Sequence, residues 1–333
     1  MSRSEVQTNI KNIPLAESLK RIRIAKEVFS TFFYKRSEIV NLLFLSCSSQ
    51  TPLLLVGPPG TAKSDIICKF TEVLSIDRSE YFEAMLTKFT EPGELFGAID
   101  ITKLKNGIHS RKIEGMLPTA KVAFLDEIFK GNSAILNSLL TIINEKKFYD
   151  EGVATTVPLK FLIAATNEIP DDDSMKALVD RFPLKIEASY VSKDKEDLRE
   201  LMTAALKFEN WKYLNKSPWK SIDLNLSDFD NVSNYVNLSL ANDSGDVNVN
   251  AFMEPVAFDI CFSTFQTLEA QKVEISDRKK VQMFKLMRTN ALLNHGGKVK
   301  ISDLNVLAYL GNRKEEIPIV SELVKTTLKD HIR

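Results

Sequence analysis

Residues 57–64 read GPPGTAKS, a glycine-rich stretch that ends in lysine and serine. The pattern G-x-x-x-x-G-K-[ST] binds nucleotide phosphates through its backbone N–H groups and its lysine, while its hydroxyl holds Mg²⁺. Ala62 replaces the second glycine, and alanine in the left-handed conformation costs about 1–2 kcal/mol. A strand, turn and helix without a ligand is the alternative. The predicted ATP-binding residues are Gly57, Pro58, Pro59, Gly60, Thr61, Ala62, Lys63 and Ser64, and Ser64 is also a predicted Mg²⁺ ligand.

Two acidic residues end the apolar run VAFLDE, residues 122–127. A buried strand with this ending places Asp126 and Glu127 at the carboxyl edge of a sheet, where open α/β sheets bind ligands. Asp126 is predicted to contact the Mg²⁺ of the nucleotide, and Glu127 to orient and deprotonate the attacking water. A strand that merely ends in solvated acids is the alternative.

A third polar residue, Asn167, ends the apolar run LKFLIAATN, residues 159–167. Alone, an asparagine at a strand end indicates only a turn. Here it follows the glycine-rich loop and the strand that ends in Asp-Glu, in that order along the chain. Its amide is therefore predicted to position the attacking water, which makes Asn167 a catalytic candidate beside Glu127.

Five short apolar runs are predicted strands, and segments with helical spacing lie between them. Continuous apolar runs suit strands that are buried on both faces of a parallel sheet. The alternation of strands with helices predicts an α/β sandwich. The predicted strands are residues 51–57, 81–87, 121–127, 159–167 and 184–188.

Composition divides the chain into three parts. Residues 1–205 contain the alternating strands and helices. Residues 206–250 are rich in Asn, Asp and Ser, and they are predicted to form a linker with one short helix capped by Ser227. Residues 251–333 show helical patterns only, which predicts an all-α domain.

Bulk composition limits the classes of function. The chain has 44 Lys+Arg and 44 Asp+Glu, so its formal net charge is zero, whereas a general nucleic-acid binder more often carries a basic excess. The 3 cysteines lie among apolar residues without metal-ligand spacing, which is typical of buried thiols in a reducing compartment. The sequence shows neither a secretory signal nor a long apolar run. We therefore expect a cytoplasmic protein without a membrane span.

Four segments carry a family resemblance: GPPGTAKS, FLDEIFKGNSAILNSLLTIINE, AATNEIP and LVDRF. In this order they resemble the MoxR family of AAA+ ATPases, and they are most similar to its RavA-like branch, which also resembles this chain in the alanine of its loop. The similarity is dense over residues 38–205 and continues weakly into ISDRKK, residues 275–280. It implies a AAA+ P-loop αβα sandwich with a five-stranded parallel sheet, followed by an all-helical lid domain.

The resemblance also implies two further site residues. Arg181, in LVDRF, matches the arginine finger that reaches the γ-phosphate of a neighbouring subunit; a local ion pair with Asp180 or Asp173 is the alternative. Arg278, in ISDRKK, matches the sensor-2 arginine that contacts the nucleotide from the start of a lid helix. A solvated basic face is the alternative for Arg278.

An insertion is predicted at residues 101–117, where Asn106–Gly107 is a strong signal for a two-residue hairpin. It resembles the helix-2 insert of this AAA+ clade, which projects toward the ring pore or a partner. The segment is basic and has no aromatic residue, so it would attract an acidic surface. An exposed hairpin kept soluble by its charges is the alternative.

The predicted function is ATP hydrolysis by a ring-forming, MoxR- and RavA-like ATPase that binds ATP and Mg²⁺ between core and lid. The resemblance implies a homo-oligomer, usually a hexamer, that acts as a chaperone on partner proteins, often with a von Willebrand factor A (vWA) domain protein. Two other functions stay open. One is a nucleic-acid-translocating motor, which would need a basic channel; the other is a structural ring that binds ATP with little turnover.

Overall fold

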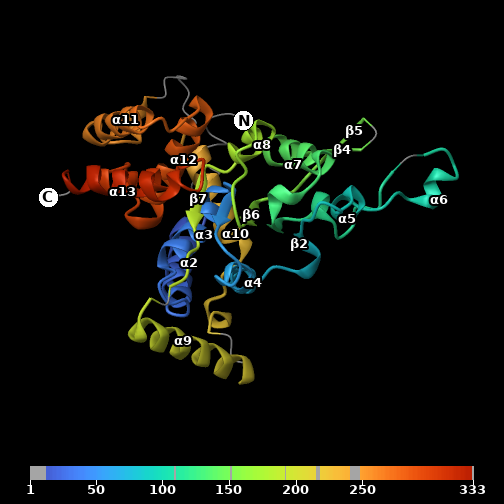
Figure 1. Ribbon diagram of the computed structural model, residues 1–333, viewed down its shortest axis with the longest axis horizontal. Coiled ribbons are helices and arrows are strands. Elements are labelled where there is room, and N and C mark those ends of the chain that lie inside the picture. Colours follow the sequence, from blue (N-terminus) through green and yellow to red (C-terminus); the bar gives the residue numbers. More distant parts are fainter. Residues whose placement is uncertain are drawn as a thin grey trace.

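Five parallel strands form the central sheet of the computed structural model, which describes residues 13–331 except 109, 151, 192, 215–217 and 241–247. The strand order is β2–β3–β6–β1–β7. The strands are β1 (Leu53–Val56), β2 (Tyr81–Met85), β3 (Val122–Asp126), β6 (Phe161–Thr166) and β7 (Leu184–Glu187). Each coincides with one of the apolar runs, so the predicted parallel α/β sheet is confirmed (Figure 1).

Helices cover both faces of the sheet, because the side chains of each strand alternate between two apolar clusters. Leu53 and Leu55 of β1 lie in the first cluster, and Leu54 and Val56 lie in the second. The first cluster includes residues of α2 (Leu15–Ser30), α3 (Ser37–Ser49), α4 (Lys63–Val73) and α10 (Leu226–Leu238). The second includes residues of α5 (Pro92–Phe96), α7 (Ser133–Glu145) and α8 (Asp173–Val179). The predicted αβα sandwich is therefore confirmed.

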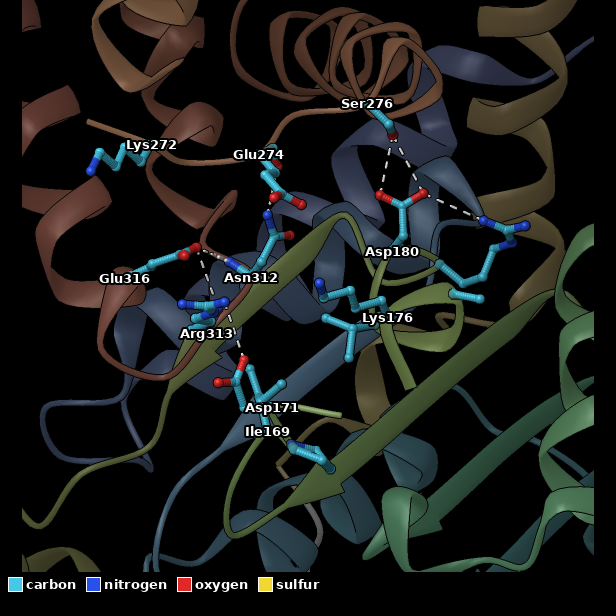
Figure 2. A pocket seen from close by; sticks show the side chains of 14 residues that line it. Ile169, Asp171, Lys176, Asp180, Lys272, Glu274, Ser276, Asn312, Arg313 and Glu316 are labelled. Carbon is cyan, nitrogen blue, oxygen red and sulfur yellow. Dashed lines mark hydrogen bonds and ion pairs between the residues drawn. The ribbon is translucent and has the colours of Figure 1, made fainter. Parts of the chain in front are cut away.

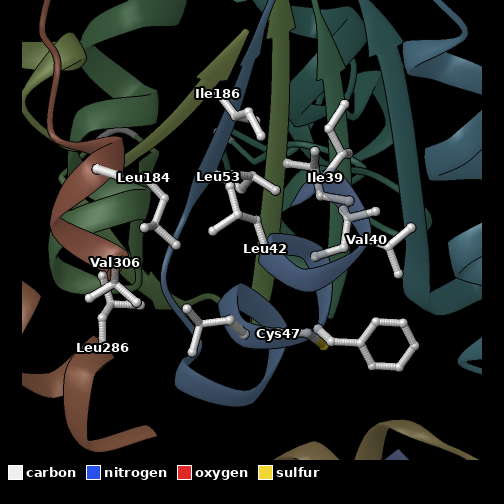
Figure 3. Packing of buried hydrophobic residues seen from close by; sticks show 14 of the residues in the cluster. Ile39, Val40, Leu42, Cys47, Leu53, Leu184, Ile186, Leu286 and Val306 are labelled. Carbon is white, nitrogen blue, oxygen red and sulfur yellow. The ribbon is translucent and has the colours of Figure 1, made fainter. Parts of the chain in front are cut away.

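The C-terminal part is helical, as the sequence predicts. It comprises α11 (Pro255–Ala270), α12 (Asp277–Asn294), the 3₁₀ helix η6 (Ile301–Tyr309) and α13 (Glu316–Lys329). Leu286 of α12 and Val306 of η6 belong to the same apolar cluster as Leu42 of α3 and Leu184 of β7 (Figure 3). The helical part thus shares a core with the sandwich. Within the described residues, no helix has the length and apolar character needed to cross a membrane.

Short elements complete the connections. The remaining 3₁₀ helices are η1 (Arg78–Glu80), η2 (Leu117–Thr119), η3 (Ile128–Lys130), η4 (Lys220–Ile222) and η5 (Val249–Ala251).

Cys47 and Cys261 are buried free thiols, as predicted, but Cys68 is exposed. The apolar neighbours of Cys68 misled the prediction, because Cys68 lies on the outer face of α4, whose buried residues include Ile67 and Phe70.

The predicted linker is structured over most of its described length. Helix α9 (Lys195–Tyr213) runs through residue 205, where the core was expected to end. Helix α10 is capped by Asn225 rather than by Ser227. Its Asp228 carboxylate is fully buried and lies 2.5 Å from the Arg21 guanidinium of α2. Because an unpaired buried charge is costly, this ion pair ties α10 to the sandwich, so α10 belongs to the core.

The predicted two-residue hairpin at Asn106–Gly107 is wrong. The chain instead forms α6 (Ile101–Leu104), because the Asp100 carboxylate accepts two backbone N–H hydrogen bonds, at 3.0 and 3.3 Å, and starts a helical turn. Asn106–Gly107 follows that turn, and its glycine has a φ of 75°. The flanks still pair in antiparallel direction through a bridge between Ile99 and Arg111, so the segment remains a projecting insertion.

A second projection was not predicted. It is the antiparallel hairpin of β4 (Lys147–Asp150) and β5 (Val153–Thr156). The Arg111 guanidinium lies 3.1 Å from the Asp150 carboxylate and connects the insertion to this hairpin. Figure 1 shows both projections on the same side of the molecule.

Candidate functional site

The loop of residues 57–64 connects β1 to α4 at the carboxyl edge of the sheet. A Cβ at Gly57 would lie 2.3 Å from the backbone oxygen of Ala188, so only glycine fits there. Gly60 has a φ of 78° and Ala62 has a φ of 61°. Ala62 therefore adopts the left-handed conformation, which explains why glycine is the usual residue at this position of the pattern. It is also the N-cap of α4 and provides no side-chain hydrogen bond, which leaves the first N–H groups of the helix free for an anion.

Lys63 holds the loop in its curled shape. Its side chain is buried, and its Nζ donates to the backbone oxygens of Gly57 at 2.5 Å and Pro58 at 2.9 Å. Burial lowers the pKa of Lys63, while the negative charges of Asp126 and Glu127 oppose that shift. The amine therefore lies in the field of both acids, and the first two motifs form one site.

Glu127 and Asn167 are in direct contact. The Asn167 side-chain amide donates a short hydrogen bond to the Glu127 carboxylate, which is 6% exposed. The residues come from the ends of β3 and β6, which are neighbours in the sheet. Lys130 Nζ lies 3.4 Å from the other oxygen of Glu127. The amide and the ammonium group thus fix the direction of a buried carboxylate, as a general base requires.

Ser64 and Asp126 fit a magnesium ion that is bound mainly through a nucleotide. Both offer hard oxygen atoms; Ser64 is exposed and Asp126 is half-buried. The Asp126 carboxylate accepts the Glu127 backbone N–H at 2.9 Å and keeps its second oxygen for other partners. Within the described residues no group of three or more His, Cys, Asp or Glu could hold a metal by itself. Mg²⁺ typically uses one or two protein ligands together with phosphates and water, so this small donor set suits it.

A cavity of about 520 Å³ lies beside the glycine-rich loop and was not predicted. Phe33, Tyr190 and Phe208 line it together with the loop. Arg36 donates to the Thr61 backbone oxygen at 3.1 Å, and to that of Ser189 at 2.7 Å. The Tyr190 hydroxyl donates to the Pro59 backbone oxygen at 3.0 Å. These residues are far apart in sequence, and the aromatic stretch FSTFFY was the only local signal.

Arg181 lies at the opposite edge of the sheet. It precedes β7, whose first residue, Leu184, pairs with Leu53 at the start of β1, whereas the loop follows the end of β1. The Arg181 guanidinium lies 3.4 Å from the Asp180 carboxylate, so the local ion pair weighed as an alternative is present. The side chain of Asp173 lies outside what the structure describes.

Arg278 lies with Arg181 rather than with Lys63. Both Ser276, at the start of α12, and Arg181 contact Asp180. Arg278 is exposed, and its charge contributes to lowering the pKa of Arg181, although burial is the larger cause. Asp126 and Glu127 are the charges that act on Lys63. The chain thus places its predicted site residues in two groups, at opposite ends of the sheet.

A family profile described as "MoxR domain in the MoxR-vWA-beta-propeller ternary systems" matches residues 20–228. A second profile, "AAA lid domain", matches residues 258–324. The crystal structure of a candidate ATPase from Cytophaga hutchinsonii superposes with a TM-score of 0.63 over 94% of both chains. At 17% identity, this likeness shows the fold alone.

Two curated relatives match most of the chain, and a third matches a shorter part. MJ0812, an uncharacterized protein of Methanocaldococcus jannaschii, is 31% identical over 293 residues, which are 88% of this chain and 70% of that protein. MJ0079, from the same organism, is 30% identical and covers 93% of this chain and 75% of that protein. "Structural protein ORF618" of Acidianus two-tailed virus is 39% identical over 40% of this chain and 22% of its own length. With a αβα sandwich, a helical lid and a matching profile over more than half of its length, the chain belongs to the MoxR family of AAA+ ATPases.

Proposed function

We propose that this protein hydrolyses ATP in a Mg²⁺-dependent reaction at the carboxyl edge of its sheet. The supporting observation is the contact between Asn167 and the buried Glu127 carboxylate, beside Asp126 and the amine of Lys63. In this proposal Glu127 accepts the proton of the attacking water, and Asn167 keeps the carboxylate directed toward it. Lys63 and the N–H groups at the start of α4 bind the phosphates. When bound by Ser64 and Asp126, Mg²⁺ neutralises charge on the phosphates.

The cavity beside the loop is the proposed place for the nucleoside. Its volume of about 520 Å³ and its aromatic walls suit a base and a sugar. Arg36 and Tyr190 hold the loop from this side through its backbone oxygens. The earlier expectation of ATP between core and lid changes accordingly, because α9 supplies the outer wall here.

Arg181 and Arg278 are proposed to act on the nucleotide of a neighbouring copy. Their position at the far edge of the sheet supports this, since neither shares an edge with Lys63 of the same chain. Contacts between unlike faces of identical subunits close into rings when the rotation permits, and we propose a hexamer. An arginine supplied in this way spreads the charge of the transition state.

The ring is proposed to remodel or mature partner proteins, together with a protein that carries a vWA domain. The family description names MoxR–vWA systems, which supports this partner class. The variant Glu127→Gln, held in ATP, should retain the partner during purification, because it binds nucleotide without completing turnover. Recovery of no vWA protein with this variant from the native cells would contradict the partner assignment. A cytoplasmic location and the RavA-like branch stay predictions.

Steady-state ATP turnover tests the enzymatic proposal. The wild type, Glu127→Gln and Lys63→Ala are compared at ring-forming concentration, with binding of a fluorescent ATP analogue as a second readout. Glu127→Gln should lose on the order of 10²–10⁴ in turnover and still bind the analogue. Lys63→Ala should lose binding. If the wild type hydrolyses ATP no faster than Glu127→Gln, the enzymatic proposal is wrong, and a structural ring with little turnover takes its place; the name of the viral relative favours that alternative.

A further inference from the structure

Asp180 lies at the junction between Arg181 and the lid. Its carboxylate is 3.4 Å from the Arg181 guanidinium and 3.1 Å from the Ser276 hydroxyl, which caps α12. Lys279 Nζ, on a side chain that is 1% exposed, is 3.3 Å from the same carboxylate. Figure 2 shows Ser276 and Asp180 facing each other beside a cavity of about 540 Å³. One carboxylate thus touches the arginine and two residues of the lid.

The contacts continue from Lys279 into the lid. Lys279 Nζ donates to the Asn312 side-chain oxygen at 2.5 Å. The Asn312 side-chain amide donates to the Glu274 backbone oxygen at 2.6 Å, and its backbone N–H donates to the Glu316 carboxylate at 2.8 Å. Asn312 therefore connects the start of α12 with the start of α13. Lys279 is buried, so moving Asp180 away from it would leave an unpaired buried charge. This cost keeps the Asp180 carboxylate in place.

Among the described residues, Asp180 contacts the Arg181 guanidinium at one end only. Asp180 contacts a single terminal nitrogen, Nη1, and the Nε atom is buried without a hydrogen-bond partner among the described residues. Within the described part of the chain no partner of the second terminal nitrogen is found, so this nitrogen can donate to a phosphate. A free arginine side chain has many rotamers, and the contact with Asp180 reduces their number before the phosphate arrives.

We propose that Asp180 is a positioning residue, which orients Arg181 for the neighbour's nucleotide and couples that arginine to the lid through Ser276 and Lys279. This inference rests on the proposed role of Arg181 in a neighbouring site. A displacement of about 1 Å in a catalytic constellation can cost 10²-fold in rate. Movement of the lid in one subunit therefore changes turnover in the next.

Mixed rings test this inference. Subunits with Glu127→Gln have an intact Arg181 but cannot hydrolyse ATP, and subunits with Arg181→Ala have an intact Lys63 and Glu127. The mixture should recover turnover, because the first subunit donates its arginine to the second. Adding Asp180→Asn to the donating subunit should lower the recovered turnover roughly 10- to 100-fold. The same substitution in the accepting subunit, which has no Arg181 to orient, should have a much smaller effect.

A matched control is Asp171→Asn in the donating subunit. Asp171 lines the same cavity, but its recorded ion pair is with Arg313, so turnover should stay unchanged. An equal fall from Asp180→Asn in both placements would show a merely structural role and overturn the inference, as would no fall in either. If the parent mixture recovers no turnover while the wild type is active, the trans role of Arg181 is wrong and the inference falls with it. Recovery that is insensitive to Asp180 refutes the inference alone.

The link to the lid is tested at Ser276. Ser276→Ala in the donating subunit removes the hydroxyl that contacts Asp180, so recovered turnover should fall several-fold. Ser276→Thr keeps a hydroxyl and an N-cap, and it should restore turnover. If alanine and threonine give equal turnover, the lid does not act through this contact.

Discussion

The two ends of the central sheet carry two separate groups of the residues that are proposed to act on ATP. At the carboxyl end, a curled loop, a buried carboxylate and an amide lie together and can bind and activate reactants. At the amino end, Arg181 lies with an exposed Arg278 beside the lid, and Asp180 is its ion-pair partner. Neither half resembles a complete NTPase site. This difference fits the proposal that a second copy of the chain completes the site, with its amino end against the carboxyl end of the first.

The largest effect is expected from substitution of Arg181, which tests catalysis separately from ATP binding. Arg181→Ala should lower turnover by about 10³–10⁵, because transition-state charge is no longer spread over a guanidinium. The affinity for a fluorescent ATP analogue should change little, since the loop with Lys63 is at the other end of the sheet. Arg181→Lys should not restore the rate, because an ammonium lacks the planar fork of donors. A loss of affinity as large as that of Lys63→Ala would place Arg181 in the binding site of its own chain.

The next largest effect is expected on folding stability, at Lys185 near the amino end of the sheet. The Lys185 side chain is fully buried and donates to the Phe182 backbone oxygen at 2.5 Å, and burial lowers its pKa well below 10.5. At pH values between the folded pKa of Lys185 and its unfolded value near 10.5, the amine is protonated in the unfolded state and neutral in the folded state. The unfolding free energy therefore rises with pH in this range. Lys185→Met should remove a slope of about 1.4 kcal/mol per pH unit and stabilise the protein most at the lower pH.

Denaturant unfolding at several pH values measures this slope. Lys88→Met is the control, because Lys88 is exposed and its removal should leave the pH dependence unchanged. An unchanged slope in Lys185→Met would show that the buried amine keeps its proton when the protein folds.

A smaller effect is expected at the wall of the cavity that is proposed to hold the nucleoside. Arg36→Ala removes two hydrogen bonds to backbone oxygens, one of them in the loop, and should weaken binding of the ATP analogue about tenfold. Tyr190→Phe removes one neutral hydrogen bond from a more exposed residue and should weaken it less. Turnover at saturating ATP should stay near that of the wild type for both variants. A fall in saturated turnover without weaker binding would contradict the assignment of this wall to binding.

The smallest effect is expected at Ala62. Glycine relieves the left-handed strain of about 1–2 kcal/mol, but it also increases the entropy of the unfolded chain by up to about 1 kcal/mol. Ala62→Gly should therefore raise the unfolding free energy by no more than about 1 kcal/mol and keep full turnover, as denaturant titration and an ATPase assay would show. A strong loss of turnover would mean that the methyl group contributes to the site.

Local signals predicted much of the fold. Each strand of the sheet is a short apolar run with a turn residue near its end, and those ends carry Gly57, Asp126 and Asn167. Parallel strands bring their carboxyl ends to one edge, so the sequence order of these residues was enough to predict their proximity. Local signals failed at Asn106–Gly107, because the carboxylate of Asp100 starts a helical turn just before it. They also missed α10 as part of the core, since its pairing partner, Arg21, is 207 residues away.

The sequence by itself determined which side chains follow each strand. It therefore also determined that the glycine-rich loop, the two acids and the asparagine lie at one edge of the sheet. Only the tertiary structure decided the position of Arg181 and Arg278 at the other edge, the wall made by Arg36 and Tyr190, and the contact of Asp180 with the lid. The physical reason is the range of the interactions. Strand direction follows from a local pattern repeated along the chain, whereas an ion pair or a cavity depends on packing between segments that are distant in sequence.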